Sequence, residues 1–255
     1  MSISSIFNDA FRFPFGNMEK WLVLGILLIL GGLSSVLISF GIDLGAVSII
    51  TSIIALIAGL IVSGYSLAIV RDTIHGYDQL PSFDIAENIV DGIKVLILSI
   101  VYSIIPVIVF FALLIVTGAA GAFIEIINLT MGGATTIPSD LALSFVGSIG
   151  ITFIISLIVL IIFSLFSTIA MCRLANTGRF SQGFAFSEII DDFKRIGVGS
   201  FIVWWIVLVI ISVILVLISV FISAIPYIGY IVSILIIYSF MTIFASRATG
   251  LIYSN

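Results

Sequence analysis

The segment Arg71–Lys94 reads RDTIHGYDQLPSFDIAENIVDGIK and is the longest clearly polar stretch in a chain of 255 residues. A similar polar segment recurs at Arg173–Lys194, and fragments of the same pattern occur at both termini. The sequence between these segments is almost entirely apolar. Polar segments that recur between long apolar runs are typical of connectors at a membrane surface, so they predict the architecture of the whole chain.

The composition indicates that lipid surrounds most of the side chains. Hydrophobic residues make up 62% of the chain and charged residues 9%, with a mean hydropathy of +1.42. Soluble domains have about a quarter of their residues charged. Several apolar runs reach the roughly 20 residues that a helix needs to cross a bilayer core. We therefore expect an all-α polytopic membrane protein.

Six apolar runs are long enough to be transmembrane helices. Their approximate bounds are 21–40, 44–70, 95–117, 143–171, 199–220 and 227–246. Three amphipathic segments accompany them, at residues 1–20, 84–94 and 184–195, each with charges on one helical face and apolar residues on the other. Asp84 and Glu87 also have the spacing of a helix capping box. These segments predict cytoplasmic interfacial helices, each placed before a pair of spans.

The basic residues predict the orientation. With six spans, all nine fall on the same side of the membrane, and the opposite loops hold only Asp43, Glu125 and Asp140. The positive-inside rule then places both termini and both polar connectors in the cytoplasm, in a multi-pass protein of the cell membrane. The basic residues that act as topology anchors are Arg12, Lys20, Arg71, Lys94, Arg173, Arg179, Lys194, Arg195 and Arg247.

The order of these features predicts a three-fold internal repeat within a single membrane domain, residues 1–255. The pseudo-repeats are 1–71, 83–173 and 184–247, and each has an amphipathic segment, a lysine, two spans and an arginine. The middle repeat carries an insertion at 118–143, where a short re-entrant or interfacial helix is expected. The same pattern would also arise in a membrane protein built from unrelated hairpins, because lysine and arginine mark most cytoplasmic helix ends.

Four short motifs resemble a known family. They are FNDAFRFPF at Phe7–Phe15, the pair Gly76-Tyr77-x-x-Leu80-Pro81 and Asp91-Gly92-x-Lys94, and the ending Arg247–Tyr253. They are similar to an archaeal polytopic membrane protein family, domain of unknown function 4013. The resemblance covers nearly the whole chain and implies an archaeal cell membrane. The family supplies no established activity, so it carries no catalytic residues onto this sequence.

The sequence contains no pattern of reactive residues. The centres of the six expected spans lack Arg, Lys, Asp, Glu and His, which argues against an ion-coupled transporter. His75 is the single histidine and lies in an expected loop, and Cys172 is the single cysteine. We interpret both as structural residues. We therefore expect no catalytic residue, no cofactor and no metal site, and we expect that the protein is not an enzyme.

Two further features remain open. Acidic residues on the amphipathic segments could bind a divalent cation, although we favour the interpretation that they form solvated polar faces. These residues are Asp84, Glu87 and Asp91 in one segment, and Glu188, Asp191 and Asp192 in the other. Asn128 begins an Asn-Leu-Thr glycosylation sequence in a loop expected outside, so it is a candidate for glycosylation.

The leading functional hypothesis is a non-enzymatic integral membrane protein with a structural, membrane-organising or scaffolding role. One alternative is a transporter or channel for a neutral or lipidic substrate, which would need a cavity within the bundle. A second alternative is an accessory subunit of a membrane complex. The expected partners are the lipid bilayer and either a second copy or a membrane complex. No basic run indicates nucleic acid.

Overall fold

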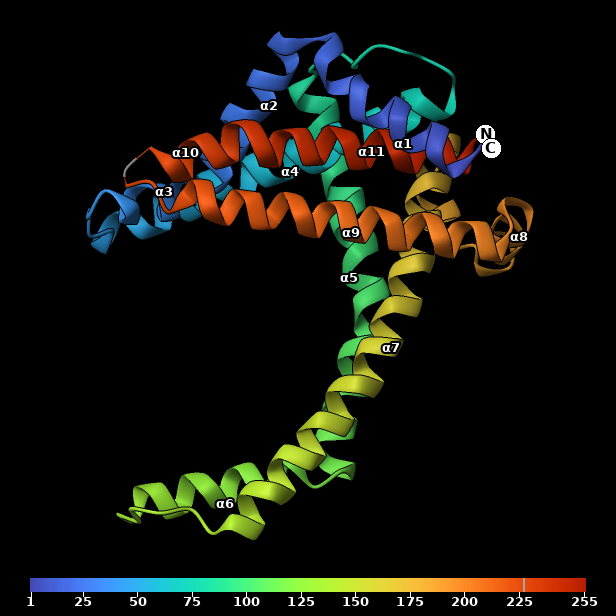
Figure 1. Cartoon of the computed structure of the whole chain (residues 1–255). Coiled ribbons are helices and arrows are strands. Elements are labelled where there is room, and N and C mark those ends of the chain that lie inside the picture. The colour runs from blue at the N-terminus through green and yellow to red at the C-terminus, as the bar shows by residue number, and fades with distance from the viewer. Residues whose placement is uncertain (227) are drawn as a thin grey trace. The chain divides into compact units, whose positions relative to one another are not determined.

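The computed structural model describes residues 1–226 and 228–255, and for Ala46 it describes the backbone alone. The described residues are almost all helical and include no strand (Figure 1). This agrees with the expected all-α class. The expected start of the sixth span, Tyr227, lies outside the described residues.

Five helical segments in the described part of the chain are long and apolar enough to cross a membrane. They are α4 (Ser48–Ile74), α5 (Ile85–Val116), α7 (Ser139–Thr177), α9 (Val198–Ser223) and the C-terminal run Gly229–Tyr253. The sequence predicted six spans. The structure supports five, or up to six if a bent helix pair near the N-terminus is one span.

The first expected span, residues 21–40, is not one continuous helix. Helix α2 (Met18–Gly31) is followed by its C-cap Gly32, and α3 (Leu33–Ser39) is a separate short helix. Two adjacent glycines weaken a helix at this position because glycine has a low helix propensity. Alone, α2 has 14 residues and a length of about 21 Å, which is short for a bilayer core.

The N-terminal segment forms α1 (Ile3–Arg12) and the 3₁₀-helix η1 (Phe13–Gly16), and α2 turns away from them by 89°. Pro14 lies in the first turn of η1, where its missing N–H is tolerated. Asn17 makes the corner: its side-chain oxygen accepts a hydrogen bond from the backbone N–H of Lys20 at 3.0 Å and so caps α2.

The polar connector differs from the expectation in one respect. Its loop half lies between α4 and α5, as expected, and Asp84 caps α5 by accepting from the Glu87 N–H at 3.0 Å. However, residues 84–94 do not form a separate interfacial helix. Helix α5 continues without a break from Ile85 to Val116. Residues 95–105 contain no glycine or proline, and Pro106 lies inside the helix without ending it.

Residues 118–143, the predicted insertion, contain a helix, as expected. Gly118 adopts a left-handed conformation with φ of 81°, which glycine accepts without strain, and α6 (Ala119–Met131) follows. The next connector, after α7, contains the 3₁₀-helix η3 (Phe180–Phe184) and the amphipathic helix α8 (Phe186–Ile196). Gly197, with φ of 91°, separates α8 from α9.

The C-terminal run consists of α10 (Gly229–Val232), a π-helical segment η4 (Ser233–Tyr238) and α11 (Ser239–Tyr253). Most residues of α11 are buried, and it packs against α1, α2, α4 and α9. The sequence predicted that the sixth span ends at residue 246, just before Arg247. The helix itself continues to Tyr253, and Arg247 is buried within it, so the predicted end of the span does not coincide with the end of the helix.

Helices α4 and α5 cross with their backbones in contact. A Cβ atom at Gly64 would overlap the carbonyl oxygen of Asn88, and one at Gly92 would overlap the carbonyl oxygen of Leu60. Glycine at both positions is what allows this approach, as in many membrane helix pairs.

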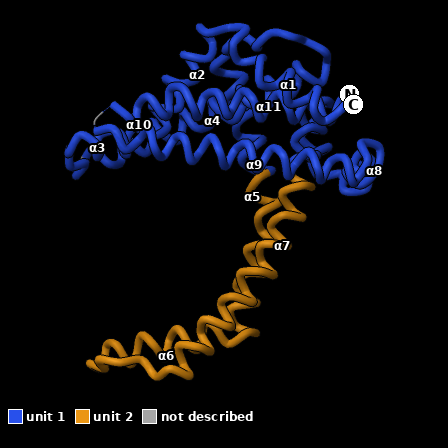
Figure 2. Tube along the Cα trace, viewed as in Figure 1, with its two compact units in different colours: residues 1–98, 168–255 blue, residues 99–167 orange. Residues whose placement is uncertain are grey.

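The chain divides into two compact units (Figure 2). Unit 1 contains residues 1–98 and 168–255, and unit 2 contains residues 99–167. Unit 1 holds the packed core around α11, and unit 2 holds α6 with parts of α5 and α7. The predicted single membrane domain with pseudo-repeats 1–71, 83–173 and 184–247 stays a prediction.

Candidate functional site

Three arginines near the C-terminal ends of long helices organise the charged side chains of unit 1. They are Arg71 on α4, Arg173 on α7 and Arg247 on α11, and each is bound by at least two carboxylates. We name each cluster after its arginine. All three clusters lie within unit 1.

The Arg71 cluster joins the end of α4 to the first turns of α5. Arg71 Nη1 lies 2.8 Å from Glu87 Oε1, and Arg71 Nη2 binds Asp91. Lys94 Nζ lies 2.7 Å from the other oxygen of Asp91. Asp91 is nearly buried, so two cations compensate the cost of removing its charge from water.

The Arg173 cluster joins the end of α7 to η3 and α8. Arg173 Nη1 lies 2.6 Å from Asp192 Oδ2, and Nη2 binds Glu188. Nη2 also donates to Gln182 Oε1 at 2.7 Å. Asp192 accepts a further hydrogen bond from the Tyr253 hydroxyl at 2.8 Å, which ties the end of α11 into the same cluster.

The Arg247 cluster brings together segments far apart in sequence. Arg247 Nε lies 2.8 Å from Asp9 Oδ1 on α1, and Nη2 lies 2.7 Å from Asp78 Oδ1 in the loop before α5. Nη1 donates to the Tyr77 carbonyl at 2.7 Å. The guanidinium also lies 4.3 Å from the Phe13 ring centre, a cation–π distance. Only 4% of the Arg247 side chain is exposed, so all its partners come from the protein.

Two more contacts hold the loop between α4 and α5, where the single histidine lies. Lys20 Nζ donates to the Leu80 carbonyl, and the Tyr65 hydroxyl donates to the Pro81 carbonyl at 3.1 Å. The Tyr65 ring stacks on Phe83. His75 is exposed, with Nδ1 2.7 Å from the Arg71 carbonyl oxygen. The loop is therefore fixed by α2, α4 and α11.

The acidic residues considered for a cation are placed against basic partners. Glu87 and Asp91 bind Arg71, Glu188 and Asp192 bind Arg173, and Asp84 caps α5. Asp191 pairs weakly with Lys194 at 3.6 Å, and both are well exposed. Within residues 1–226 and 228–255, no group of three or more His, Cys, Asp or Glu side chains could hold a metal ion.

The remaining predicted residues lie apart from these clusters. Cys172 is buried, and its thiol lies 3.8 Å from the Thr249 carbonyl. Asn128 is exposed on α6, inside the helix rather than in a loop. Arg12 and Arg179 are exposed. The role of the basic residues as topology anchors stays a prediction.

Sequence reasoning missed the long-range members of the clusters. Asp9 and Arg247 are 238 positions apart, and Asp78 and Arg247 are 169 apart. The Trp21 indole N–H donates to Ser239 Oγ at 2.6 Å, a pair separated by 218 positions. The sequence alone indicated only that these polar residues lie in amphipathic segments or near helix ends, and it did not indicate which of them meet.

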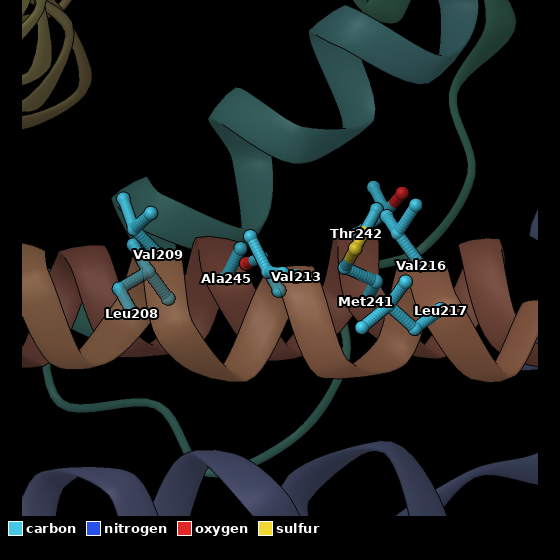
Figure 3. Close-up of a pocket in the computed structure, with 9 residues that line it drawn as sticks. Leu208, Val209, Val213, Val216, Leu217, Met241, Thr242 and Ala245 are labelled. Carbon is cyan, nitrogen blue, oxygen red and sulfur yellow. The ribbon is translucent and has the colours of Figure 1, made fainter.

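A groove of unit 1 lies between α9 and α11 (Figure 3). Its volume is about 440 Å³. Figure 3 shows Val213 and Val216 of α9 facing Ala245 and Met241 of α11. Its lining contains no charged side chain, and Ser212 and Thr242 are the polar residues among apolar ones.

These features define a class: an all-helical protein with five or six long apolar helices, consistent with an integral membrane protein, whose clustered charges hold helix ends together. The chain belongs to the family described as "Protein of unknown function (DUF4013)", whose model matches residues 47–224. No curated protein matches the chain, and no solved structure matches it.

Proposed function

We propose that this chain is a non-enzymatic integral protein of the cell membrane with a structural, membrane-organising role and with both termini in the cytoplasm. One observation carries the proposal: the three arginines of unit 1 bind carboxylates, and these ion pairs hold polar and amphipathic segments against helix ends. An enzyme or a coupled carrier would instead need charged groups that face a substrate.

Helix α8 supports a position at the bilayer surface. At 3.6 residues per turn, its apolar residues fall on one side, but only part of that side meets the protein. Ile189 is fully buried, whereas Phe186 is 53% exposed and Ile190 is 42% exposed. Because the polar face carries Lys194 and Arg195, the exposed apolar residues fit the acyl boundary of a bilayer.

The N-terminal helices repeat this arrangement. Ile6 and Ala10 of α1 are buried, whereas Phe11 and Phe15 are about half exposed. The ion pair between Arg247 and Asp9 holds α1 against α11. The two amphipathic helices α1 and α8 are each fixed to a longer helix by an arginine. This arrangement favours a protein that organises the membrane surface.

The clusters also support the proposed three-fold repeat. Arg71 ends the first repeat and binds the polar segment that opens the second. Arg173 ends the second repeat and binds α8, which opens the third. Arg247 ends the third repeat and binds Asp9 of the first. This head-to-tail order is what three related units in a closed ring would produce.

Contact between the two ends of the chain supports termini on the same side. The Met1 amino group binds the Asn255 side chain, and Asn255 Nδ2 donates to the Met1 carbonyl at 3.2 Å. Figure 1 shows the two ends side by side. Termini on one side require an even number of crossings, which favours six spans over five.

The rival function is a carrier or channel for a neutral or lipidic substrate. Unit 1 gives it little support, because the buried helix α11 occupies the interior where a pathway would run. Unit 2 offers grooves that suit a lipid and are treated below. The accessory-subunit alternative, with a homo-oligomer or membrane-complex partner, would appear as co-purification in mild detergent.

The test reconstitutes the purified protein in liposomes and measures vesicle shape by cryo-electron microscopy. We expect the wild-type protein to change vesicle curvature and Ile190→Glu to reduce that change, because a charge on the exposed apolar strip opposes insertion. Ser187→Glu is the matched control: it adds the same charge on the polar face of α8 and should behave as wild type.

The proposal fails if the wild-type protein neither changes vesicle shape nor binds a cytoplasmic partner. It also fails if Ile190→Glu and Ser187→Glu have equal effects, because the exposed apolar strip would then contribute nothing.

A further inference from the structure

Two adjoining cavities in unit 2 lie along α5 and α7. The first is a notch of about 130 Å³, lined in part by the hydroxyls of Ser99 and Ser103 on α5 and Ser167 on α7. The second is a groove of about 280 Å³, and aromatic and aliphatic side chains dominate its lining. Pro106 and Leu160 line both cavities, so the polar notch continues into the apolar groove.

The notch has a defined hydrogen-bonding character. Ser103 Oγ donates its hydrogen to the Ile100 carbonyl at 2.8 Å. A hydroxyl has one hydrogen and two lone pairs, so this oxygen can only accept from a ligand. The lining contains no charged side chain that would compensate an ionised head group. The hydroxyls of Ser99 and Ser167 can also donate to a ligand. The best complement is therefore an uncharged group that both donates and accepts a hydrogen bond, such as an alcohol.

The order of the two cavities along α5 matches the order of groups in a lipid. Ser99 follows Lys94, the basic residue predicted at the membrane surface, by five positions or about 8 Å of helix rise. Pro106 and Phe110 come later in the same helix and lead into the apolar groove. A hydroxyl near the surface with a hydrocarbon chain running deeper would satisfy both cavities.

We propose that the notch and groove form a binding site for a lipid with an uncharged hydroxyl head and a long hydrocarbon chain. The hydroxyl donates to Ser103 in the notch, and the chain packs against Phe110 and Phe153 in the groove. The site depends on the chain lying in a membrane, but it is independent of any effect on membrane shape.

The test uses the full-length protein in phosphatidylcholine nanodiscs and a hexadecanol probe with a diazirine in its chain. After irradiation, mass spectrometry locates the cross-links. We expect them in residues 106–111 and 153–160. Unlabelled hexadecanol should compete at least tenfold better than hexadecane or methyl palmitate, which have similar chains but cannot donate a hydrogen bond.

Two variants separate the head from the chain. Ser103→Ala should weaken competition by hexadecanol roughly fivefold, the value of one hydrogen bond of about 1 kcal/mol, and leave competition by hexadecane unchanged. Leu160→Trp should fill the junction and reduce labelling by the probe. Ser144→Ala, an exposed serine of α7 outside both cavities, is the matched control and should match wild type.

Equal competition by the three compounds would overturn the proposal, because the groove would then accept any hydrocarbon. Cross-links confined to the groove between α9 and α11 would also overturn it, as would equal effects of Ser103→Ala and Ser144→Ala. The vesicle-shape experiment does not involve these residues, so either proposal can fail alone.

Discussion

Arg247 shows how this chain places a charge in its core. An arginine surrounded by apolar helices would be costly, and it persists here because its donors meet Asp9, Asp78 and the Tyr77 carbonyl. Asp9 and Asp78 themselves remain 41% and 85% exposed, so water shares the cost of their charges. One side chain thereby fixes α1, α11 and the loop before α5.

Arg247→Gln should lower the free energy of unfolding by about 2 kcal/mol, because hydrogen bonds between charged groups each contribute about 1.5–3 kcal/mol. The freed carboxylates stay hydrated, which limits the loss. Hydrogen exchange of α1 should become faster, since its main polar contact with α11 is removed. Thermal unfolding in detergent and exchange mass spectrometry measure the two effects.

Arg179→Gln is the control, because Arg179 is exposed in the turn after α7. Its effect should stay within about 0.5 kcal/mol. Unchanged exchange in α1 of Arg247→Gln would show that other contacts, such as the packing of Phe11 on Phe240, hold this helix.

At the scale of elements, the crossing of α4 and α5 depends on two glycines. Gly64 and Gly92 each face a carbonyl oxygen of the other helix, and there is no space for a methyl group. Glycine in a helix usually costs stability relative to alanine. Its presence here is explained by the close approach, which also brings Arg71 within reach of Glu87 and Asp91.

Gly64→Ala and Gly92→Ala should each destabilise the protein by about 1–3 kcal/mol, the range for overpacked sites. The added methyl forces α4 and α5 apart. Gly59→Ala on α4 is the matched control, because a Cβ there meets open space. It should leave stability unchanged or raise it by up to about 1 kcal/mol. Equal losses for all three variants in thermal unfolding would mean that the crossing is not the cause.

At the scale of the whole molecule, the proposed topology specifies which polar segments share a side of the membrane. Cys172 is buried, so it should not react in the intact protein and provides a silent background. Ser82 and Thr135 are exposed and lie in loops that the six-span topology places on opposite sides. Ser82 belongs to the connector before α5, and Thr135 follows α6.

An impermeant maleimide should label Thr135→Cys in intact cells and should label Ser82→Cys only after lysis. Mass shift on a denaturing gel measures the labelling, and the wild-type protein is the control for Cys172. Labelling of Ser82→Cys alone in intact cells would reverse the proposed orientation. Labelling of both in intact cells would contradict the placement of these loops on opposite sides.

The sequence predicted the helical class and most apolar segments because hydropathy and helical period are local properties. It also predicted the cap at Asp84 and a helix within residues 118–143, and the structure contains both. The re-entrant or interfacial character of that helix stays a prediction. The predicted helix bounds were wrong where the neighbouring residues alone do not determine where a helix begins or ends. Residues 85–94 are the first turns of the continuous helix α5. The expected first span, residues 21–40, is interrupted at Gly32.

By itself, the sequence determined the helical class and the long apolar segments, which suggest a membrane protein, because these properties depend on local composition and period. Only the tertiary structure decided what the polar residues do. The charges of Arg71–Lys94 first indicate a membrane-surface connector, and the fold turns several of them into ion pairs with α4. The Arg247 partners could not be inferred, since contacts over more than 160 positions depend on how helices pack.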